Sequence, residues 1–135
     1  MADKSTILKA FNNHFFEFFD DLINIVEDNT DIKSSKKFLS LTKMANASLI
    51  IKIWYQFIST PYKSYFESGD LDYFANKDYS EDLSQLANAK DTLKALDKFR
   101  VPLKSLDQSN KEKCLEYLKN LCKLSDLYDN LSKKH

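Results

Sequence analysis

The chain has 135 residues, 43% of them hydrophobic, and its 20 basic and 20 acidic side chains give a formal net charge of zero. This balance lacks the overall positive charge that a dedicated nucleic-acid-binding protein carries. The single glycine, Gly69, excludes phosphate-binding loops, nucleophile elbows and dinucleotide fingerprints, because each of these requires several glycines. Sheet-rich folds also use glycine in their turns, so the composition favours one all-α domain over residues 1–135.

The first predicted helix covers residues 5–27. Apolar side chains recur there at intervals of three and four residues, which places them on one face of a helix. They are Leu8, Phe11, Phe15, Phe18 and Leu22, widened by Phe19, Ile23 and Val26. The polar run over residues 28–31 has the turn and capping residues that end a helix.

Two further helices are predicted over residues 32–43 and 48–59. In the first of them, Phe38, Leu39 and Leu41 are expected to face inward. Asn46 is a candidate N-cap for the second. Apolar side chains surround almost the whole axis of the segment 48–59, so this helix is expected to be the buried centre of the fold. Those side chains are Leu49, Ile50, Ile51, Ile53, Trp54, Phe57 and Ile58.

Proline and glycine mark the boundaries that follow. Pro61 is expected to end or kink the third helix, because it has no N–H and disfavours helical geometry at Thr60. Gly69 is expected to adopt the left-handed conformation that closes a short helical segment.

Capping signals predict the remaining helices. Ser80 and Asn88 are candidate starts for helices over residues 80–86 and 90–101. Ser109 with Glu112 forms a capping box that opens a last helix. The sequence therefore predicts a single compact bundle of five or six helices.

Charge is distributed in blocks along the chain. Residues 32–65 carry six lysines and no acidic residue, whereas residues 1–31 carry two lysines and seven acidic residues. Lys33, Lys36, Lys37 and Lys43 therefore form a lysine cluster that is a candidate for binding an acidic partner or a phosphate backbone. The alternative is that the second helix lies beside the acidic first helix and that their charges pair on the surface.

The helices over 32–43 and 48–59 have the spacing of a helix-turn-helix motif. A recognition helix must present polar side chains to base edges, and the second of these helices is almost entirely apolar. Nucleic-acid binding through the lysine-rich block 33–63, by phosphate contact without sequence readout, is therefore kept as the alternative function.

The sequence predicts no catalytic residue, no metal site, no cofactor and no small-molecule substrate. The acidic stretch 70–81 imitates a calcium loop, but Phe74 and Ala75 stand where an oxygen ligand and a glycine are required. His14 is expected at the edge of the core, hydrogen-bonded to a neighbour.

Cys114 and Cys122 follow a helical pattern that separates them by about 12 Å along the axis, which is too far for a disulfide. Two reduced, buried thiols and a cytoplasmic environment are therefore expected. The amino terminus lacks the pattern of a secretion signal, and the most apolar window, residues 49–58, is too short to span a membrane.

Nine of the 18 aromatic side chains lie between residues 54 and 79. Tyr55, Tyr62 and Tyr65 are the members expected to be exposed, and exposed tyrosines are favoured at protein interfaces. This segment predicts a non-enzymatic protein that binds a protein partner, which includes a second copy of itself. The alternative is that these rings pack the end of the third helix against the turns that follow.

Three segments carry a resemblance to known proteins: AFNNHFFEFFDDL at 10–22, IIKIWYQFISTPYKSYFESGDLDYF at 50–74 and KDYSEDL at 77–83. Together they resemble small uncharacterised proteins encoded by nucleocytoplasmic large DNA viruses of algae and protists. The resemblance covers most of the chain and contains no chemical motif, so no functional residue is carried over. It implies a viral product that acts in the host cytoplasm or in the virion, with a structural or partner-binding role rather than a metabolic one.

Overall fold

The computed structural model describes residues 3–25, 30–76, 94–95, 98, 100–103 and 106–133, and every regular element among them is helical. The prediction of an all-α chain is confirmed for this part of the sequence. The predicted helix starts at Ser80 and Asn88 lie outside the described residues. The elements are α1 (Lys4–Ile25), α2 (Thr30–Ala45), α3 (Leu49–Trp54), the π-helical turn η1 (Tyr55–Ser59), α4 (Thr60–Glu67), α5 (Leu71–Asn76), α8 (Arg100–Leu103) and α9 (Gln108–Ser132).

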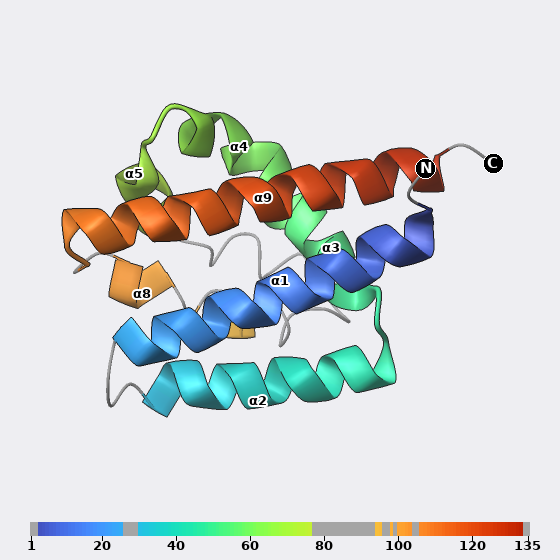
Figure 1. Cartoon of the computed structure of the whole chain (residues 1–135), viewed down its shortest axis with the longest axis horizontal. Coiled ribbons are helices and arrows are strands. Elements are labelled where there is room, and N and C mark those ends of the chain that lie inside the picture. The colour runs from blue at the N-terminus through green and yellow to red at the C-terminus, as the bar shows by residue number, and fades with distance from the viewer. Residues whose placement is uncertain are drawn as a thin grey trace.

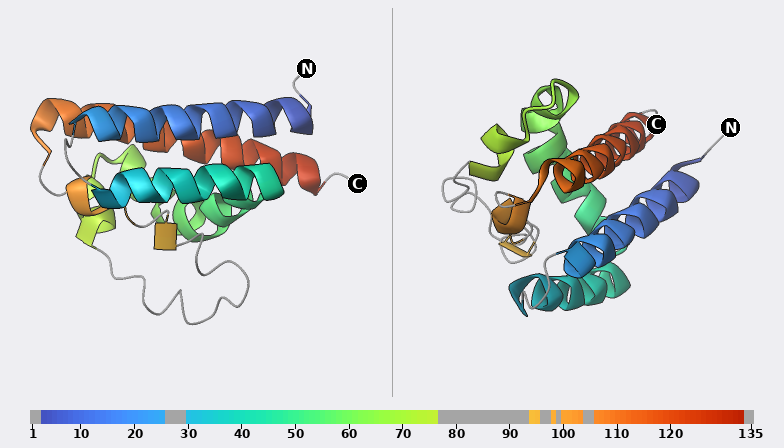
Figure 2. Two further views of the ribbon diagram at one scale, coloured as in Figure 1. Left: turned by 90° about the horizontal axis from the view of Figure 1, so that it is seen from below. Right: turned by 60° about the vertical axis from the view of Figure 1, so that its left-hand side comes forward.

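The two longest helices, α1 and α9, lie side by side and run in opposite directions (Figures 1 and 2). On the other side of α1, the helix α2 runs antiparallel to it and also contacts α3. The elements α3, η1 and α4 follow one another along a single path that crosses α9 (Figure 1). Among the described residues, α2 is therefore an outer element that packs against α1 and α3.

Aromatic rings from α1 form the centre of the core. Phe11, Phe15, Phe18 and Phe19 are fully buried, as their spacing predicted. The Trp54 ring at the end of α3 packs edge-on against two of them, with ring centroids 6.1 Å from Phe11 and 5.9 Å from Phe15. Such edge-to-face pairs add to the free energy gained from burial. From the opposite side α9 contributes Cys114, Leu118, Leu121, Cys122 and Tyr128.

The short helix α3 lies between these two layers. Ile50, Ile51, Ile53 and Trp54 are all buried, whereas Lys52 is exposed. The predicted role of this segment as a buried apolar helix is confirmed. Its burial also rules out a recognition helix that would present these side chains to DNA.

The prediction allowed an end or a kink of the third helix at Pro61, with Thr60 outside helical geometry; the end and the non-helical Thr60 are wrong. Thr60 keeps helical backbone angles, φ −57° and ψ −50°, and the helical path continues into α4. The π-helical turn η1 accommodates the proline: the Thr60 N–H donates to the Tyr55 carbonyl five residues earlier, and the Thr60 hydroxyl donates to the same oxygen over 2.8 Å. Pro61 thereby lies in the first turn of α4, directly after the π-helical turn.

Two of the predicted helix starts are displaced. Asp107 caps α9 in place of Ser109, because its carboxylate accepts a hydrogen bond from the Asn110 N–H over 2.8 Å. Ser48 occupies the N-cap position of α3, and the side chain of Asn46 accepts from the Ser48 N–H over 3.2 Å in the turn before it.

The left-handed conformation predicted for Gly69 is confirmed by its φ of 84°. The N–H of Gly69 donates to the Phe66 carbonyl, and the N–H of Asp70 donates to the Tyr65 carbonyl over 2.8 Å. These two bonds form a Schellman motif that closes α4. The Asp70 carboxylate then accepts from the Tyr73 N–H and caps α5.

Candidate functional site

The outward-facing side of α2 carries large apolar side chains in contact with solvent. Leu41 is 58% exposed, Met44 is 83% exposed and Phe38 is 41% exposed. The prediction that Phe38 and Leu41 face inward is therefore wrong, while the burial of Leu39 is confirmed. Three exposed apolar residues within two turns of one helix form a patch of the kind that marks interaction sites.

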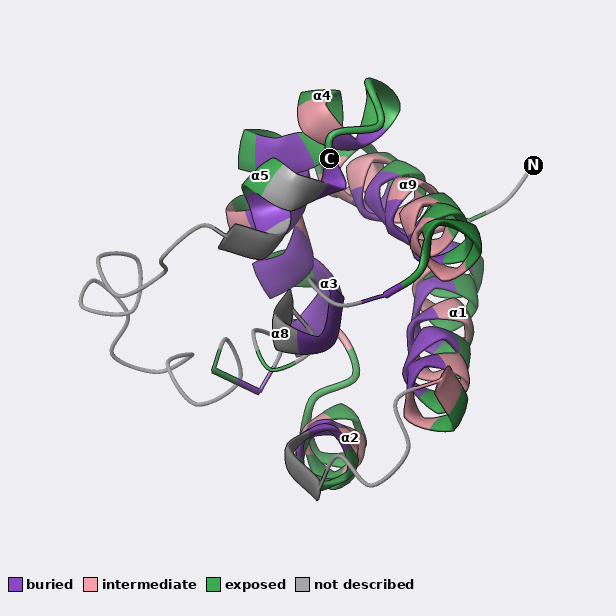
Figure 3. Ribbon diagram, turned by 90° about the vertical axis from the view of Figure 1, so that its left-hand side faces the viewer, coloured by how far each residue is buried: buried purple, intermediate pink, exposed green. Residues whose placement is uncertain are grey.

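The helical period explains how this patch arises. Ile32, Ser35 and Leu39 are buried and lie at intervals of three and four, so they define the inner side of α2. Lys33, Lys37, Leu41 and Met44 follow the same intervals on the opposite side, and all four are exposed. Figure 3 shows α2 close to end-on, with the exposed residues turned away from the other helices. These four residues, with Phe38 beside Leu41, are called the outer face of α2.

Only part of the lysine cluster belongs to this outer face. Lys36 forms an ion pair with Asp20 of α1, and the ammonium group of Lys43 lies over the Phe16 ring, 5.5 Å from its centroid. Both lysines therefore face α1, and the predicted pairing of charges between the first two helices is confirmed for Lys36 and Asp20. Lys33 and Lys37 have no ion-pair partner among the described residues and remain beside the apolar patch.

A groove of about 420 Å³ between α1 and α2 borders the outer face at Met44. Asn12 lies in its floor and is only 3% exposed. Its side-chain N–H donates to the Ala47 carbonyl over 3.0 Å, which fixes the orientation of the amide. The Oδ1 atom of Asn12 is then a buried acceptor without a donor in the described part of the chain.

The aromatic segment is more buried than the sequence indicated. Tyr62 is 3% exposed, so the prediction that it lies on the surface is wrong. Its ring contacts Phe74 with centroids 5.2 Å apart and Tyr73 with centroids 6.0 Å apart. Tyr65 is half-buried and stacks on Tyr73 at 4.1 Å, and a hydrogen bond with Tyr73 raises the pKa of the Tyr65 phenol. The rings of this segment therefore pack α4 against α5, as the alternative interpretation proposed.

Tyr55, the third tyrosine of the predicted site, lies apart from this cluster. It lines a groove of about 500 Å³ between η1 and the end of α9, with Gln56 and Asp129. Asp129 is already paired with Lys133 of the same helix over 2.9 Å. The structure thus separates Tyr55 from Tyr62 and Tyr65, and separates all three from the lysines of α2.

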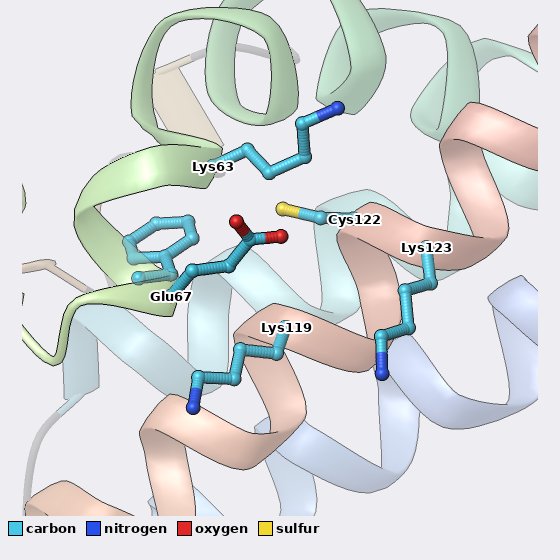
Figure 4. A pocket seen from close by; sticks show the side chains of 6 residues that line it. Lys63, Glu67, Lys119, Cys122 and Lys123 are labelled. Atoms are coloured by element: carbon cyan, nitrogen blue, oxygen red, sulfur yellow. The ribbon is translucent and has the colours of Figure 1, made fainter.

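A smaller cleft of about 240 Å³ lies between α4 and α9, and three lysines line it (Figure 4). Lys63 is paired with Asp126 over 2.9 Å, and Asp126 also accepts from the Ser59 hydroxyl over 2.8 Å. Figure 4 shows the ammonium groups of Lys119 and Lys123 turned away from the Cys122 sulfur. Because the positive charges do not converge on one point, this cleft is a poor candidate for an anion site.

Burial makes the two cysteines unreactive. Both are free and buried, as predicted. Burial, together with the charge of Asp21, raises the pKa of the Cys114 thiol to about 11. Burial also raises the pKa of the Cys122 thiol to about 11, although the neighbouring Ser59 and Trp54 side chains oppose the increase. A nucleophilic cysteine needs the opposite shift, so these thiols act as core side chains.

The raised thiol pKa values predict a loss of stability at alkaline pH. The stability gained from keeping the thiols neutral is complete below pH 9, where unfolded thiols are also protonated. This stability is lost as the pH rises from 9 to about 11, because the thiols of the unfolded chain ionise at a lower pH than those of the folded chain. Urea unfolding should show a decrease of about 2 kcal/mol from Cys122. The Cys114→Ala, Cys122→Ala double variant should show a smaller decrease, and an equal one would contradict the assignment.

His14 lies at the edge of the core, as predicted, but without the predicted hydrogen bond: its Nε2 atom is buried with no partner among the described residues. Its ring packs against Tyr117 of α9 with centroids 4.8 Å apart, and its Nδ1 is 3.9 Å from a Glu17 carboxylate oxygen. The Tyr117 hydroxyl donates to Asp21. Burial and this hydrogen bond strongly raise the pKa of the Tyr117 phenol. The group connects α1 to α9 and contains no activated nucleophile.

The described residues contain no cluster of three or more His, Cys, Asp or Glu side chains that would hold a metal ion. Residues 71–76 of the calcium-like stretch form α5, and the second half of that stretch lies outside the described residues. Among the helices that are described, none is both long and apolar enough to cross a membrane.

Comparison with known proteins gives no match: no family model, no curated protein and no solved structure is significantly similar to this chain. Its candidate site therefore rests on its own geometry.

Proposed function

We propose that this chain is a non-enzymatic interaction protein and that the outer face of α2 is its docking surface. The observation that supports this most strongly is the exposure of Leu41 and Met44 beside Lys33 and Lys37. Each buried apolar side chain of this size contributes about 1.5–3 kcal/mol when it leaves water. A partner that covers both residues would gain that free energy, and the neighbouring ammonium groups would orient it.

The proposal moves the docking surface away from the aromatic segment, because Tyr62 belongs to the core and Tyr65 is stacked on Tyr73. It keeps two of the four lysines of the cluster, since Lys36 is paired with Asp20 and Lys43 lies over Phe16. The resemblance to proteins of large DNA viruses suggests the setting: an accessory or virion protein that meets its partner in the host cytoplasm or in the particle.

Nucleic-acid binding through the block 33–63 is the weaker proposal. A protein that binds the phosphate backbone needs several lysines free to replace its counterions. In this block Lys36 is paired with Asp20, Lys43 lies over Phe16 and Lys63 is paired with Asp126. This leaves Lys33, Lys37 and the more distant Lys52, which together favour a protein partner over a phosphate backbone.

Site-specific cross-linking tests the docking surface. The photoreactive amino acid benzoylphenylalanine is placed at Leu41 or, as a matched control, at Leu127, an exposed leucine of α9. After irradiation of cells that express the chain, position 41 should give a discrete cross-linked product and position 127 should not. Mass spectrometry identifies the partner. The proposal fails if neither position, or both equally, form the product.

A further inference from the structure

The partner of this surface can be specified by its chemistry. We propose that the outer face of α2 binds an acid-rich amphipathic helix, whose apolar stripe covers Leu41 and Met44 and whose flanking carboxylates meet Lys33 and Lys37. This inference rests on the proposed docking function and adds the class of partner.

Charge complementarity supports an acidic partner. Residues 32–65 contain six lysines and no acidic residue, so this block contributes no negative charge that would neutralise the outer face. Asp20 of α1, which lies beside α2, is already paired with Lys36 on the side facing α1. Lys37 lies one helical turn before Leu41 and Lys33 lies two turns before it, so both present positive charge next to the apolar residues. A partner with carboxylates at those positions would form new ion pairs at the rim of the contact.

The shape of the outer face supports a helix. Its residues follow a single line along α2 from Lys33 to Met44, which is about 16 Å long at 1.5 Å per residue. A helix laid along this line would place residues spaced by three, four and seven against it, as in other helix-in-groove complexes. The α1–α2 groove runs beside Met44, and its floor holds the unsatisfied Asn12 acceptor.

A second copy of this chain fits the surface less well. If two α2 helices paired in parallel through their outer faces, the lysines of both copies would be brought together, and in an antiparallel pairing they would meet no acidic residue of the other α2 between Ile32 and Ala45. Like charges at a contact lower affinity and select against that pairing. Sedimentation of the wild type should therefore show a monomer. A dimer that the Leu41→Glu, Met44→Glu variant abolishes would overturn the proposal in favour of self-association.

Selection from a display library tests the partner class directly. The library consists of helical peptides of about 20 residues, long enough to form a helix in water. Leucines are fixed at helical spacing, and the flanking positions vary among Glu, Gln and Lys. Selection on the full chain should enrich Glu at the flanks. A synthetic peptide of the selected sequence should lose measurable binding to the Leu41→Glu, Met44→Glu variant.

Charge reversal provides the matched control. The Lys33→Glu, Lys37→Glu variant should bind the selected peptide about tenfold more weakly or worse, and a peptide with its Glu residues changed to Lys should recover that affinity. The control variant Lys113→Glu, Lys123→Glu changes the net charge by the same amount as the α2 variant, at exposed residues of α9, and should leave binding unchanged. Circular dichroism verifies that each variant is folded.

The outcomes separate this inference from the docking function. Peptides that need Leu41 and Met44 but carry neutral or basic flanks would overturn the acidic partner and leave the docking surface intact. Acid-rich peptides that bind all variants equally would overturn both the acidic partner and the docking surface, because the peptide would then bind outside the outer face of α2. If the library yields no binder, the helical partner is overturned, while the cross-link from position 41 still decides the docking function.

Discussion

Ile53→Asp is expected to lower the free energy of unfolding by about 3–5 kcal/mol, which is enough to unfold many small domains. Ile53 is 4% exposed on α3, the helix that packs between α1 and α9. A carboxylate at this position would lose its hydration and gain no partner among the apolar side chains around it. Urea unfolding followed by circular dichroism measures the change.

The neighbouring residue provides a matched control for this variant. Lys52→Asp introduces the same side chain one position earlier on the same helix, where the residue is exposed. Its effect should stay within about 0.5–1 kcal/mol, since helix propensity and surface charge are the only contributions. If the two variants unfolded at the same urea concentration, the burial of α3 would be contradicted.

Much of the fold follows from periodicity. The apolar residues of α1 recur over six turns, and a pattern of this length identifies the buried face of the helix even where one residue departs from it. The Phe11, Phe15 and Phe18 positions were therefore predicted correctly. The burial of Ile50, Ile51, Ile53 and Trp54 was also predicted correctly, because a segment that is apolar almost all round is buried whichever way it turns, although the single helix expected over 48–59 is α3 followed by the π-helical turn η1.

The outer face of α2 could not be predicted in the same way. This helix has few apolar residues, and Ile32 and Leu39, seven residues apart, define one side while Phe38 and Leu41 lie away from it. The sequence alone does not decide whether the Ile32 and Leu39 side or the Phe38 and Leu41 side faces the core. The choice depends on how α1 and α3 contact the helix, and that contact links residues far apart in the chain. The signal available in the sequence was the mismatch itself: Phe38, Leu39 and Leu41 cannot all share one narrow helix face.

The capping errors have a local cause. Asp107 and Ser109 both carry an oxygen that can accept from an N–H two or three residues later, so the sequence offers two starts for α9. At Pro61, the π-helical turn depends on the Thr60 hydroxyl and on burial of Ile58 and Ser59, which no local rule predicts.

Tyr62→Ala should lower stability and retain binding. The Leu41→Glu, Met44→Glu pair on α2 should retain stability and lose binding. Tyr62→Ala is expected to lower the free energy of unfolding by about 3 kcal/mol, because it removes a buried ring from between α4 and α5. The α2 pair should change it by no more than about 0.5–1 kcal/mol, because both side chains are already in water. Chemical unfolding of the purified variants measures these changes.

Affinity for the partner cross-linked from position 41 should follow the reverse order. The α2 pair should weaken it by about 30-fold or more, the effect of removing an interface anchor that contributes about 2 kcal/mol. Tyr62→Ala, measured at a temperature where it stays folded, should bind within about threefold of the wild type, because α4 and α5 do not contact α2 extensively. Leu127→Glu makes the same kind of change on α9 and should alter neither property. If Tyr62→Ala removed binding while the α2 pair retained it, the docking surface would belong to the aromatic segment after all.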